Sequence, residues 1–356
     1  MAKLDAAAGN VEASLGWLRR LAAVGATANL GAEEAFSDLV GEAGFDELAA
    51  RLVENGRPQA PAEVVATLDD AELWPEGVAF DSETGDLFVG SMSKNKIVTI
   101  RSDGVVEDFG TSAEDDLWPV LGMTVDVMRR HLWAAMGEGS DELVTEGERR
   151  RNGVVRYDLE TGRQLARYEL ADDGVNRLLN DVVVATDGTA YVTESNHGSV
   201  YRITPEDDAL RHFRFFPDLN YLNGLALSAD DRILYLAAVE GVFALLLDEE
   251  RLLPLAQSDE ITSVGGDGLC RVGSSLIAVQ NQPLLGFRVM RFHLDPTGLR
   301  ITRGEVLAAG LPSGLIPYTC AVGSAEVFIN GTGPLDMMDR NEVPAPPAVV
   351  RVPLGG

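Results

Sequence analysis

The 356-residue sequence is poor in basic residues and histidine, and both shortages narrow the possible functions. Lysine and arginine number 29 against 56 acidic residues, which gives a net charge of −27. A protein so acidic would repel the phosphates of nucleic acids and anionic lipids, so neither is expected as a partner. Most of the acidic residues are interpreted as a solvated surface. Only four histidines are present, and none stands in a pattern that indicates catalysis; His197 is interpreted as a loop residue.

Cysteine is also scarce, and long apolar runs are missing. No run of about 18 apolar residues occurs, so no membrane-spanning helix is expected. The N-terminus lacks the pattern of a signal peptide, and a cytoplasmic location is predicted. Cys270 and Cys320 both lie in apolar, strand-like runs. We expect buried free thiols there, because both runs are apolar. A disulfide is the alternative, and it would require the two Cα atoms to lie close together.

Residues 1–60 differ from the rest in being rich in alanine, leucine and glutamate. Apolar residues recur there at helical spacing, in a first run and again between residues 32 and 55, where Gly41 and Gly44 interrupt the pattern. The first run contains Leu15, Leu18, Leu21 and Ala22. We therefore predict a helical N-terminal extension over residues 1–60, acting either as a lid or as a packing appendage. Residues 61–356 are predicted to form a separate domain.

From residue 62 onward the sequence changes to short alternating strands, and an internal repeat appears. Each unit reads as an apolar strand, a turn and a second strand of the Leu-Tyr-Val type. The six units start at residues 77, 122, 181, 224, 268 and 320. A repeat of roughly 40–50 residues built from four strands is typical of a propeller blade. The predicted fold is an all-β, six-bladed β-propeller, in which residues 62–68 complete the last blade and close the ring.

Four polar residues recur at the starts of these units, each directly before a small or acidic residue and an apolar strand. They are Glu76, Asn180, Asn223 and Asp267. The innermost strands of a propeller line its central channel, so these residues should meet on the axis. Asn-Gly and Asp-Gly are common in turns when taken singly, but a turn does not require equivalent positions in several blades. Two carboxylates and two amides form an all-oxygen set, which suits calcium best and zinc less well.

The loops at the same end should build a pocket around such a metal. The second strand of each blade returns to that end, and aromatic residues precede several inner strands. On this basis the predicted pocket residues are Trp74, Trp118, Glu194, Asn281 and Tyr318.

The series Trp-Pro-Glu-Gly, Asn-Asp, Asn-Gly and Asp-Gly, each opening an apolar strand, resembles the senescence marker protein/gluconolactonase family, which includes regucalcin. Paraoxonases and diisopropyl fluorophosphatases are related to it. The resemblance covers roughly residues 62–352 and implies a six-bladed propeller with an axial divalent metal that hydrolyses lactones or related esters. The predicted cofactor is calcium, from the all-oxygen ligand set, with Zn²⁺, Mg²⁺ or Mn²⁺ as alternatives. The resemblance also implies that Asp267 is both a metal ligand and the general base or nucleophile.

Two positions depart from the resembled pattern. Leu121 stands where a paraoxonase-like catalytic histidine would fall, and Leu178 stands where regucalcin-like sugar lactonases have an arginine. The favoured hypothesis is a metal-dependent lactonase or esterase acting on a small-molecule lactone or ester. The alternatives are a phosphotriesterase-like or natural-product-tailoring enzyme on the same scaffold, and a non-catalytic propeller that serves as a binding module. The sequence leaves the oligomeric state open.

Overall fold

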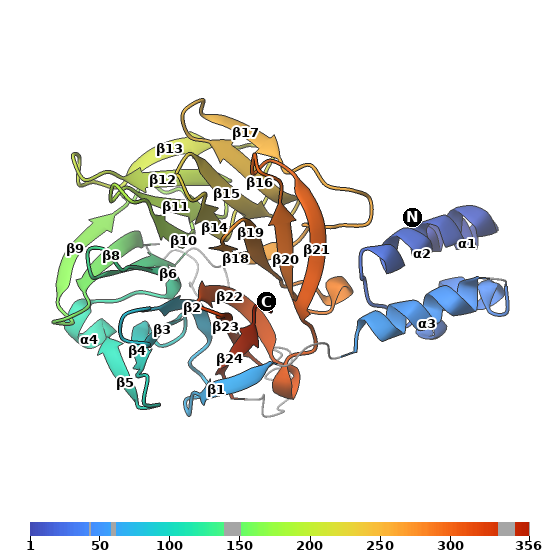
Figure 1. Cartoon of the computed structure of the whole chain (residues 1–356), viewed down its shortest axis with the longest axis horizontal. Helices are drawn as coiled ribbons and strands as arrows, with labels where there is room; N and C mark the ends of the chain where they lie inside the picture. Colours follow the sequence, from blue (N-terminus) through green and yellow to red (C-terminus); the bar gives the residue numbers. More distant parts are fainter. Residues whose placement is uncertain (43, 58–61, 139–150, 334–345, 356) are drawn as a thin grey trace.

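The computed structural model describes residues 1–42, 44–57, 62–138, 151–333 and 346–355. Within these residues, six four-stranded antiparallel sheets surround a central axis like the blades of a propeller (Figure 1). The predicted six-bladed β-propeller is therefore confirmed. None of the helices in the described ranges is long and apolar enough to cross a membrane.

The strands of each blade follow one another from the axis to the rim. Blade one contains β2 (Pro75–Phe80), β3 (Leu87–Ser91), β4 (Lys96–Ile100) and β5 (Val106–Gly110), followed by the short helix α4 (Ser112–Asp115). Blade two contains β6 (Val120–Asp126), β7 (His131–Gly137), β8 (Asn152–Asp158) and β9 (Gln164–Glu169). Blade three contains β10 (Leu179–Val184), β11 (Ala190–Glu194), β12 (Ser199–Ile203) and β13 (Arg211–Phe215).

Blades four and five repeat this order. Blade four contains β14 (Leu225–Leu227), β15 (Ile233–Ala238), β16 (Gly241–Leu246) and β17 (Arg251–Pro254). Blade five contains β18 (Gly266–Val272), β19 (Ser275–Gln280), the 3-10 turn η3 (Pro283–Leu285), β20 (Arg288–Leu294) and β21 (Ile301–Ala308). The 3-10 turn η4 (Pro312–Gly314) leads into blade six.

Blade six is built from both ends of the propeller sequence. Its inner strands are β22 (Ile316–Val322), β23 (Glu326–Thr332) and β24 (Ala348–Pro353). The outermost strand is β1 (Glu63–Thr67), which pairs antiparallel with β24. The prediction that residues 62–68 complete the last blade is confirmed. This pairing closes the ring and covers an edge that would otherwise be open to other strands.

The middle strands are buried on both faces because each blade packs against two neighbours. All five residues of β3 and all six of β19 are buried. These strands therefore read as nearly continuous apolar runs rather than as an alternation of polar and apolar residues. Phe88 of blade one packs with Trp118 and Leu132 at the boundary to blade two, in one of the clusters that join neighbouring blades.

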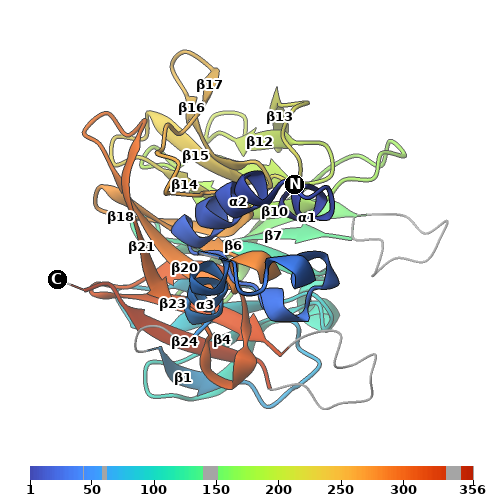
Figure 2. The same ribbon diagram turned by 90° about the vertical axis from the view of Figure 1, so that its right-hand side faces the viewer.

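The N-terminal helices lie at the side of the propeller, next to blade five (Figures 1 and 2). They comprise α1 (Ala2–Ala7), α2 (Val11–Ala23), the 3-10 segments η1 (Leu30–Ala32) and η2 (Glu34–Leu39), and α3 (Phe45–Asn55). Gly41 and Gly44, both with positive φ, separate η2 from α3, as the sequence indicates. Val40 is exposed and lies outside the shared core of the helices. Residues 58–61 of the expected linker lie outside the described residues.

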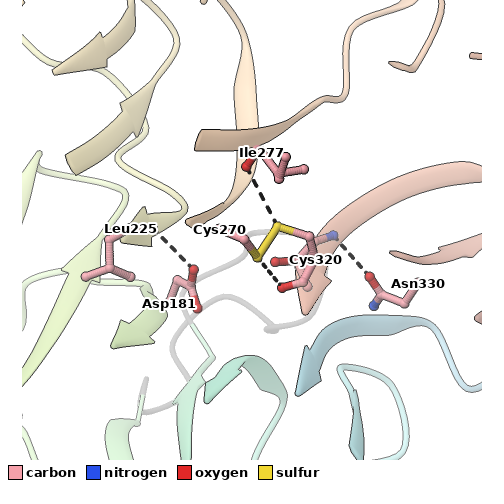
Figure 3. The surroundings of a disulfide bond; sticks show 7 residues. Asp181, Leu225, Cys270, Ile277, Cys320 and Asn330 are labelled. Carbon is pink, nitrogen blue, oxygen red and sulfur yellow. Dashed lines mark hydrogen bonds between the residues drawn. A yellow bond between two sulfur atoms is a disulfide. The ribbon is translucent and has the colours of Figure 1, made fainter. Parts of the chain in front are cut away.

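Cys270 and Cys320 form a disulfide, so the expectation of free thiols is wrong. They lie on β18 and β22, the inner strands of consecutive blades, where the propeller narrows toward its axis. Their Cα atoms are 6.2 Å apart, which is within reach of a disulfide. Figure 3 shows the bridge with Asp181 and Asn330 nearby. The sequence could not reveal this contact, because it depends on the close approach of two blades.

Candidate metal centre

Each inner strand carries one residue at an equivalent point near its start. From blade one to blade six, they are Glu76, Leu121, Asn180, Asn223, Asp267 and Tyr318. In β2, β6, β10, β18 and β22 the pairing register shifts by one residue around this point. In blade four the point precedes β14. Such a bulge bends the strand and redirects a side chain, and in three blades the side chain is a predicted ligand, namely Glu76, Asn180 or Asp267.

The glycines that follow these positions are required by the narrowness of the axis. A Cβ atom on Gly77 would lie 1.9 Å from the carbonyl oxygen of Leu121 in the next blade. A Cβ atom on Gly268 would lie 2.4 Å from the Cα atom of Thr319. Neither distance is physically possible without moving backbone. The repeated Glu-Gly and Asp-Gly pairs thus combine a polar side chain with a residue that allows neighbouring inner strands to touch.

A cavity of about 240 Å³ opens at this end of the axis. Glu76, Asn223 and Asp267 all line it, so three of the four predicted ligands face the same space. Asn180 is buried and is not among the lining residues. Its side-chain nitrogen donates a hydrogen bond to Ser195 Oγ at 3.0 Å, and Ser195 Oγ donates to the carbonyl oxygen of Leu222 at 2.6 Å.

The carboxylates near this cavity have raised pKa values. Burial raises the pKa of Glu76 well above its ordinary value, and the charges of Asp267 and Asp181 add to the effect. Burial also raises the pKa of Asp267 to about 7, although hydrogen bonds from Asn281 and Asn223 oppose the rise. The amide of Asn281 donates to Asp267 Oδ2 at 2.9 Å. Three acidic groups therefore share a confined space in which their negative charges repel one another.

Asp181 occupies the place that glycine takes after the ligand position in most other blades. Its carboxylate accepts hydrogen bonds from the backbone N–H groups of Val182, at 2.8 Å, and Leu225, at 3.4 Å. Burial raises the pKa of Asp181 to about 7, while the two N–H donors lower it and Asp267 raises it further. Asp181 thus joins blade three to blade four and contributes negative charge close to the centre.

The side chains around the cavity fit a hard divalent cation. No lysine or arginine lines it in the part of the chain that the structure describes, so none of the described basic side chains neutralises Glu76 and Asp267. No group of three or more His, Cys, Asp or Glu residues arranged for a metal occurs among the described residues. A cation here would therefore also need amide oxygen from Asn223 and water. Such mixed oxygen sets are suited to calcium.

One wall of the cavity is apolar. Met92, Leu121 and Leu178 form a small buried cluster, with Trp74 packed against it. All four line the cavity. Leu121 and Leu178 are the two residues that depart from the resembled family pattern, and the structure brings them together. The cavity thus has acidic and amide groups at the inner strand starts and a hydrocarbon surface beside them.

Of the five predicted pocket residues, Trp74, Asn281 and Tyr318 line the cavity, whereas Trp118 and Glu194 do not. Trp118 is only 2% exposed, and its ring packs under the guanidinium groups of Arg151 and Arg167. Trp74 lies two residues before Glu76, but Trp118 lies three residues before Leu121. In extended backbone, an offset of one residue turns a side chain to the opposite face.

Glu194 is likewise displaced by one residue from the position that Asn281 occupies in blade five. It pairs with Leu179 in its sheet, just as Gln280 pairs with Gly266, so Glu194 is equivalent to Gln280. The Glu194 carboxylate is fully buried and accepts hydrogen bonds from the backbone N–H groups of Leu178, Asn196 and His197 at 3.0–3.1 Å. The residue equivalent to Asn281 is Ser195. Ser195 contacts Asn180 as Asn281 contacts Asp267.

Sequence reasoning did not select Tyr221, Val239, Gly265, Gly266 or Gln282, although all of them line the cavity. A partial signal existed for two of them. Trp74, Tyr221 and Gly265 each lie two residues before a predicted ligand, and all three have positive φ. The loop that enters these inner strands therefore turns in the same way in three blades. The spacing of two residues before a ligand, which Trp74 shares and which can be read from the sequence, would have identified Tyr221 and Gly265.

The six-bladed propeller agrees with comparison to known proteins. Residues 74–242 match the sequence model of the SMP-30/gluconolactonase/LRE-like region, so the resemblance to this family is confirmed over that stretch. The matched stretch contains Glu76, Asn180 and Asn223 and ends before Asp267. No curated protein matches the chain by sequence.

Solved structures share the propeller at low sequence identity. A gluconolactonase from Xanthomonas campestris is 19% identical, with a TM-score of 0.54, over 83% of this chain and 96% of its own. The calcium-binding protein regucalcin from Agrobacterium tumefaciens is 13% identical, with a TM-score of 0.57, over 82% and 93%. A PQQ-bound aldose sugar dehydrogenase from Streptomyces coelicolor is 14% identical, with a TM-score of 0.56, over 83% and 99%. These likenesses extend to the fold alone, because the same architecture carries different chemistry.

Proposed function

We propose that the protein is a metal-dependent hydrolase of lactones or related esters, with calcium as the cation. One observation carries this proposal: Glu76, Asn223 and Asp267 come from three blades and line a single cavity that no described lysine or arginine enters. The matching family region supports the same class of reaction. In this proposal Asn180 completes the ligand set through its side-chain oxygen, since its nitrogen is already engaged with Ser195.

The chemistry divides between the cation and the protein. A bound divalent cation would polarise the substrate carbonyl and stabilise negative charge on its oxygen. Asp267 is the proposed general base or nucleophile. Asn281 donates a hydrogen bond to one of its carboxylate oxygens and so holds the group in place beside the proposed cation.

The apolar wall suggests the kind of substrate. Leu121 and Leu178 offer no charge or hydrogen bond to a polyhydroxylated sugar acid, and Met92 and Trp74 extend the same surface. We therefore propose lactones or esters with an apolar substituent as substrates. Burial of such a substituent would contribute about 25 cal/mol per Å² of apolar surface removed from water.

The test is hydrolysis by chelated and calcium-restored enzyme of alkyl-substituted lactones, sugar-acid lactones, aryl esters and an aryl phosphotriester. Turnover should disappear with the chelator, return with calcium and favour the alkyl-substituted lactones. Asp267→Asn should abolish turnover. Asp126→Asn serves as the control, because Asp126 lies at the far end of an inner strand and pairs with Arg129.

Hydrolysis that persists without metal, or Asp267→Asn turning over at the wild-type rate, would contradict the proposed mechanism. Activity confined to the phosphotriester would favour the phosphotriesterase-like alternative. Calcium binding without turnover of any substrate in the panel would favour a non-catalytic binding propeller.

A further inference from the structure

The loop between β19 and β20 contacts both the candidate metal centre and the N-terminal helices. We call residues 281–287 the blade-five loop; they contain η3. At its start, Asn281 donates a hydrogen bond to Asp267 Oδ2 at 2.9 Å. At its centre, Leu285 is buried in the core of the helical segment together with Leu15, Leu18 and other apolar residues. One short loop therefore has its first residue at the cavity and its centre in the helices.

The helical segment also holds the loop through its backbone. The N–H group of Thr27 donates to the carbonyl oxygen of Leu284 at 2.7 Å. The Thr27 hydroxyl donates to the carbonyl oxygen of Pro283 at 3.3 Å. A Cβ atom on Gly286 would lie 3.0 Å from Thr27 Cγ2, so the two chains are in tight contact there. These contacts fix the tip of the blade-five loop from the side of the helices.

A buried pair of side chains makes a second connection at the base of the loop. Arg288 is 2% exposed, and its Nη1 donates to the carbonyl oxygen of Gly25, just beyond the end of α2, at 3.1 Å. Gly25 lies two residues beyond α2, so this hydrogen bond holds the chain that leaves the helix. Arg288 Nε donates to Gln280 Oε1 at 2.8 Å. The guanidinium thus connects the end of α2 to the blade-five sheet.

Gln280 carries the connection to the cavity wall. It is fully buried, and its amide nitrogen donates to the carbonyl oxygens of Thr262 and Val264, both at 2.9 Å. The next residues along the chain, Gly265 and Asp267 among them, line the cavity. The blade-five loop contacts the same stretch directly, because a Cβ atom on Gly265 would lie 2.3 Å from Gln282 Cγ.

We propose that the N-terminal helical segment is a positioning element of the metal centre and acts through the blade-five loop and the Arg288–Gln280 pair. This inference rests on the proposed metal-binding function of Asp267. The helical segment lies beside blade five rather than across the axis, as Figure 1 shows, so it acts on the wall of the cavity and does not cover its opening. Residues that orient a metal ligand from outside affect metal affinity because they set the ligand's position.

The test compares calcium binding by variants of the full chain, measured by isothermal titration calorimetry well below the unfolding temperature. Leu285→Ala removes the anchor of the loop, and Arg288→Met removes both hydrogen bonds of the guanidinium. Each should weaken calcium binding by about tenfold, the lower end of the effect seen for partners of metal ligands. Arg288→Lys retains the charge near the end of α2 and should recover part of the affinity.

Leu39→Ala is the matched control. Leu39 is buried in the same helical core as Leu285 but lies in η2, away in the sequence from Gly25 and Thr27, which accept or donate the hydrogen bonds to Arg288 and the blade-five loop. It should lower the unfolding temperature and leave calcium affinity unchanged. A loss of affinity in Leu39→Ala equal to that in Leu285→Ala would show that general destabilisation, rather than positioning, is the cause and would overturn the proposal.

A second readout does not depend on metal. Amide hydrogen exchange of residues 262–267, measured without calcium, should accelerate in Leu285→Ala and Arg288→Met and stay unchanged in Leu39→Ala. Unchanged exchange there in the first two variants would overturn the positioning role. Wild-type protein that fails to bind calcium would instead contradict the proposed metal centre, so the two failures are distinguishable.

Discussion

The calcium-free protein should be more stable at pH 6 than at pH 8. Burial raises the pKa values of Asp267 and Asp181 to about 7, from ordinary values of 3.8. Between those values the folded state binds more protons than the unfolded state. The contribution of these two groups to stability is therefore greatest below about pH 4 and falls as pH rises through about 7, and the decrease is nearly complete at pH 8.

The magnitude follows from the two pKa values. A carboxyl group with a pKa of 3.8 when unfolded and about 7 when folded contributes about 1.4 kcal/mol of stability at pH 6 and almost none at pH 8. Two such groups acting independently give a difference of about 3 kcal/mol, a large part of the 5–15 kcal/mol that stabilises a typical domain. Calcium at 100 times its dissociation constant would add about 2.7 kcal/mol and so would offset most of the loss at pH 8.

The assay is urea unfolding at pH 6 and pH 8, with chelator and with calcium. The net charge of −27 also makes folding less favourable as pH rises, so a control must isolate the site. Asp267→Asn provides it, because asparagine does not titrate. In the presence of chelator, the difference in the free energy of unfolding between pH 6 and pH 8 should be smaller in this variant than in the wild type by at least about 1.4 kcal/mol. Asp126→Asn should keep the wild-type difference.

Two outcomes would refute this reasoning. One is chelated protein that is as stable at pH 8 as at pH 6, since Asp267 and Asp181 would then titrate at ordinary values. The other is an Asp267→Asn variant that keeps the full pH dependence, since overall charge alone would then explain it. Calcium that stabilises Asp267→Asn as strongly as the wild type would remove Asp267 from the ligand set.

The parts of the site that repeat with the blades could be predicted from the sequence. Glu76, Asn180, Asn223 and Asp267 recur at one phase of the repeat, and blades place equivalent positions around one axis. The same phase includes Leu121 and Tyr318, which the sequence placed before inner strands but not among the ligands, because their side chains are not strong oxygen ligands. Their equivalence became visible only through the register shift in β6 and β22.

The features that depend on contacts between distant segments could not be predicted in this way. The disulfide requires two inner strands to approach, and the docking of Leu285 into the helices requires segments more than 200 residues apart to meet. The prediction that Trp118 and Glu194 line the pocket was wrong for a more local reason. Each was placed by its nearness to a strand end, whereas the direction of a side chain in a strand changes with every residue.

Two further predictions concern the inner strands. Gly268→Ala should destabilise the protein by about 3 kcal/mol or more, because its Cβ atom would collide with the backbone of Thr319. Gly16 lies in α2, and a Cβ atom added there would have nothing within 4 Å, so Gly16→Ala should instead stabilise the protein by about 0.5–1 kcal/mol. Chemical unfolding of both variants measures the contrast. Equal effects on stability would contradict the tight packing at the axis. Reduction of the disulfide, or its replacement with serines at Cys270 and Cys320, should cost about 4 kcal/mol, since the bridge closes a loop with a sequence separation of 50 residues and limits the unfolded chain. Unfolding with and without a phosphine reductant measures this loss, and a reductant that changes nothing in the wild type would show that the two thiols are not joined in solution.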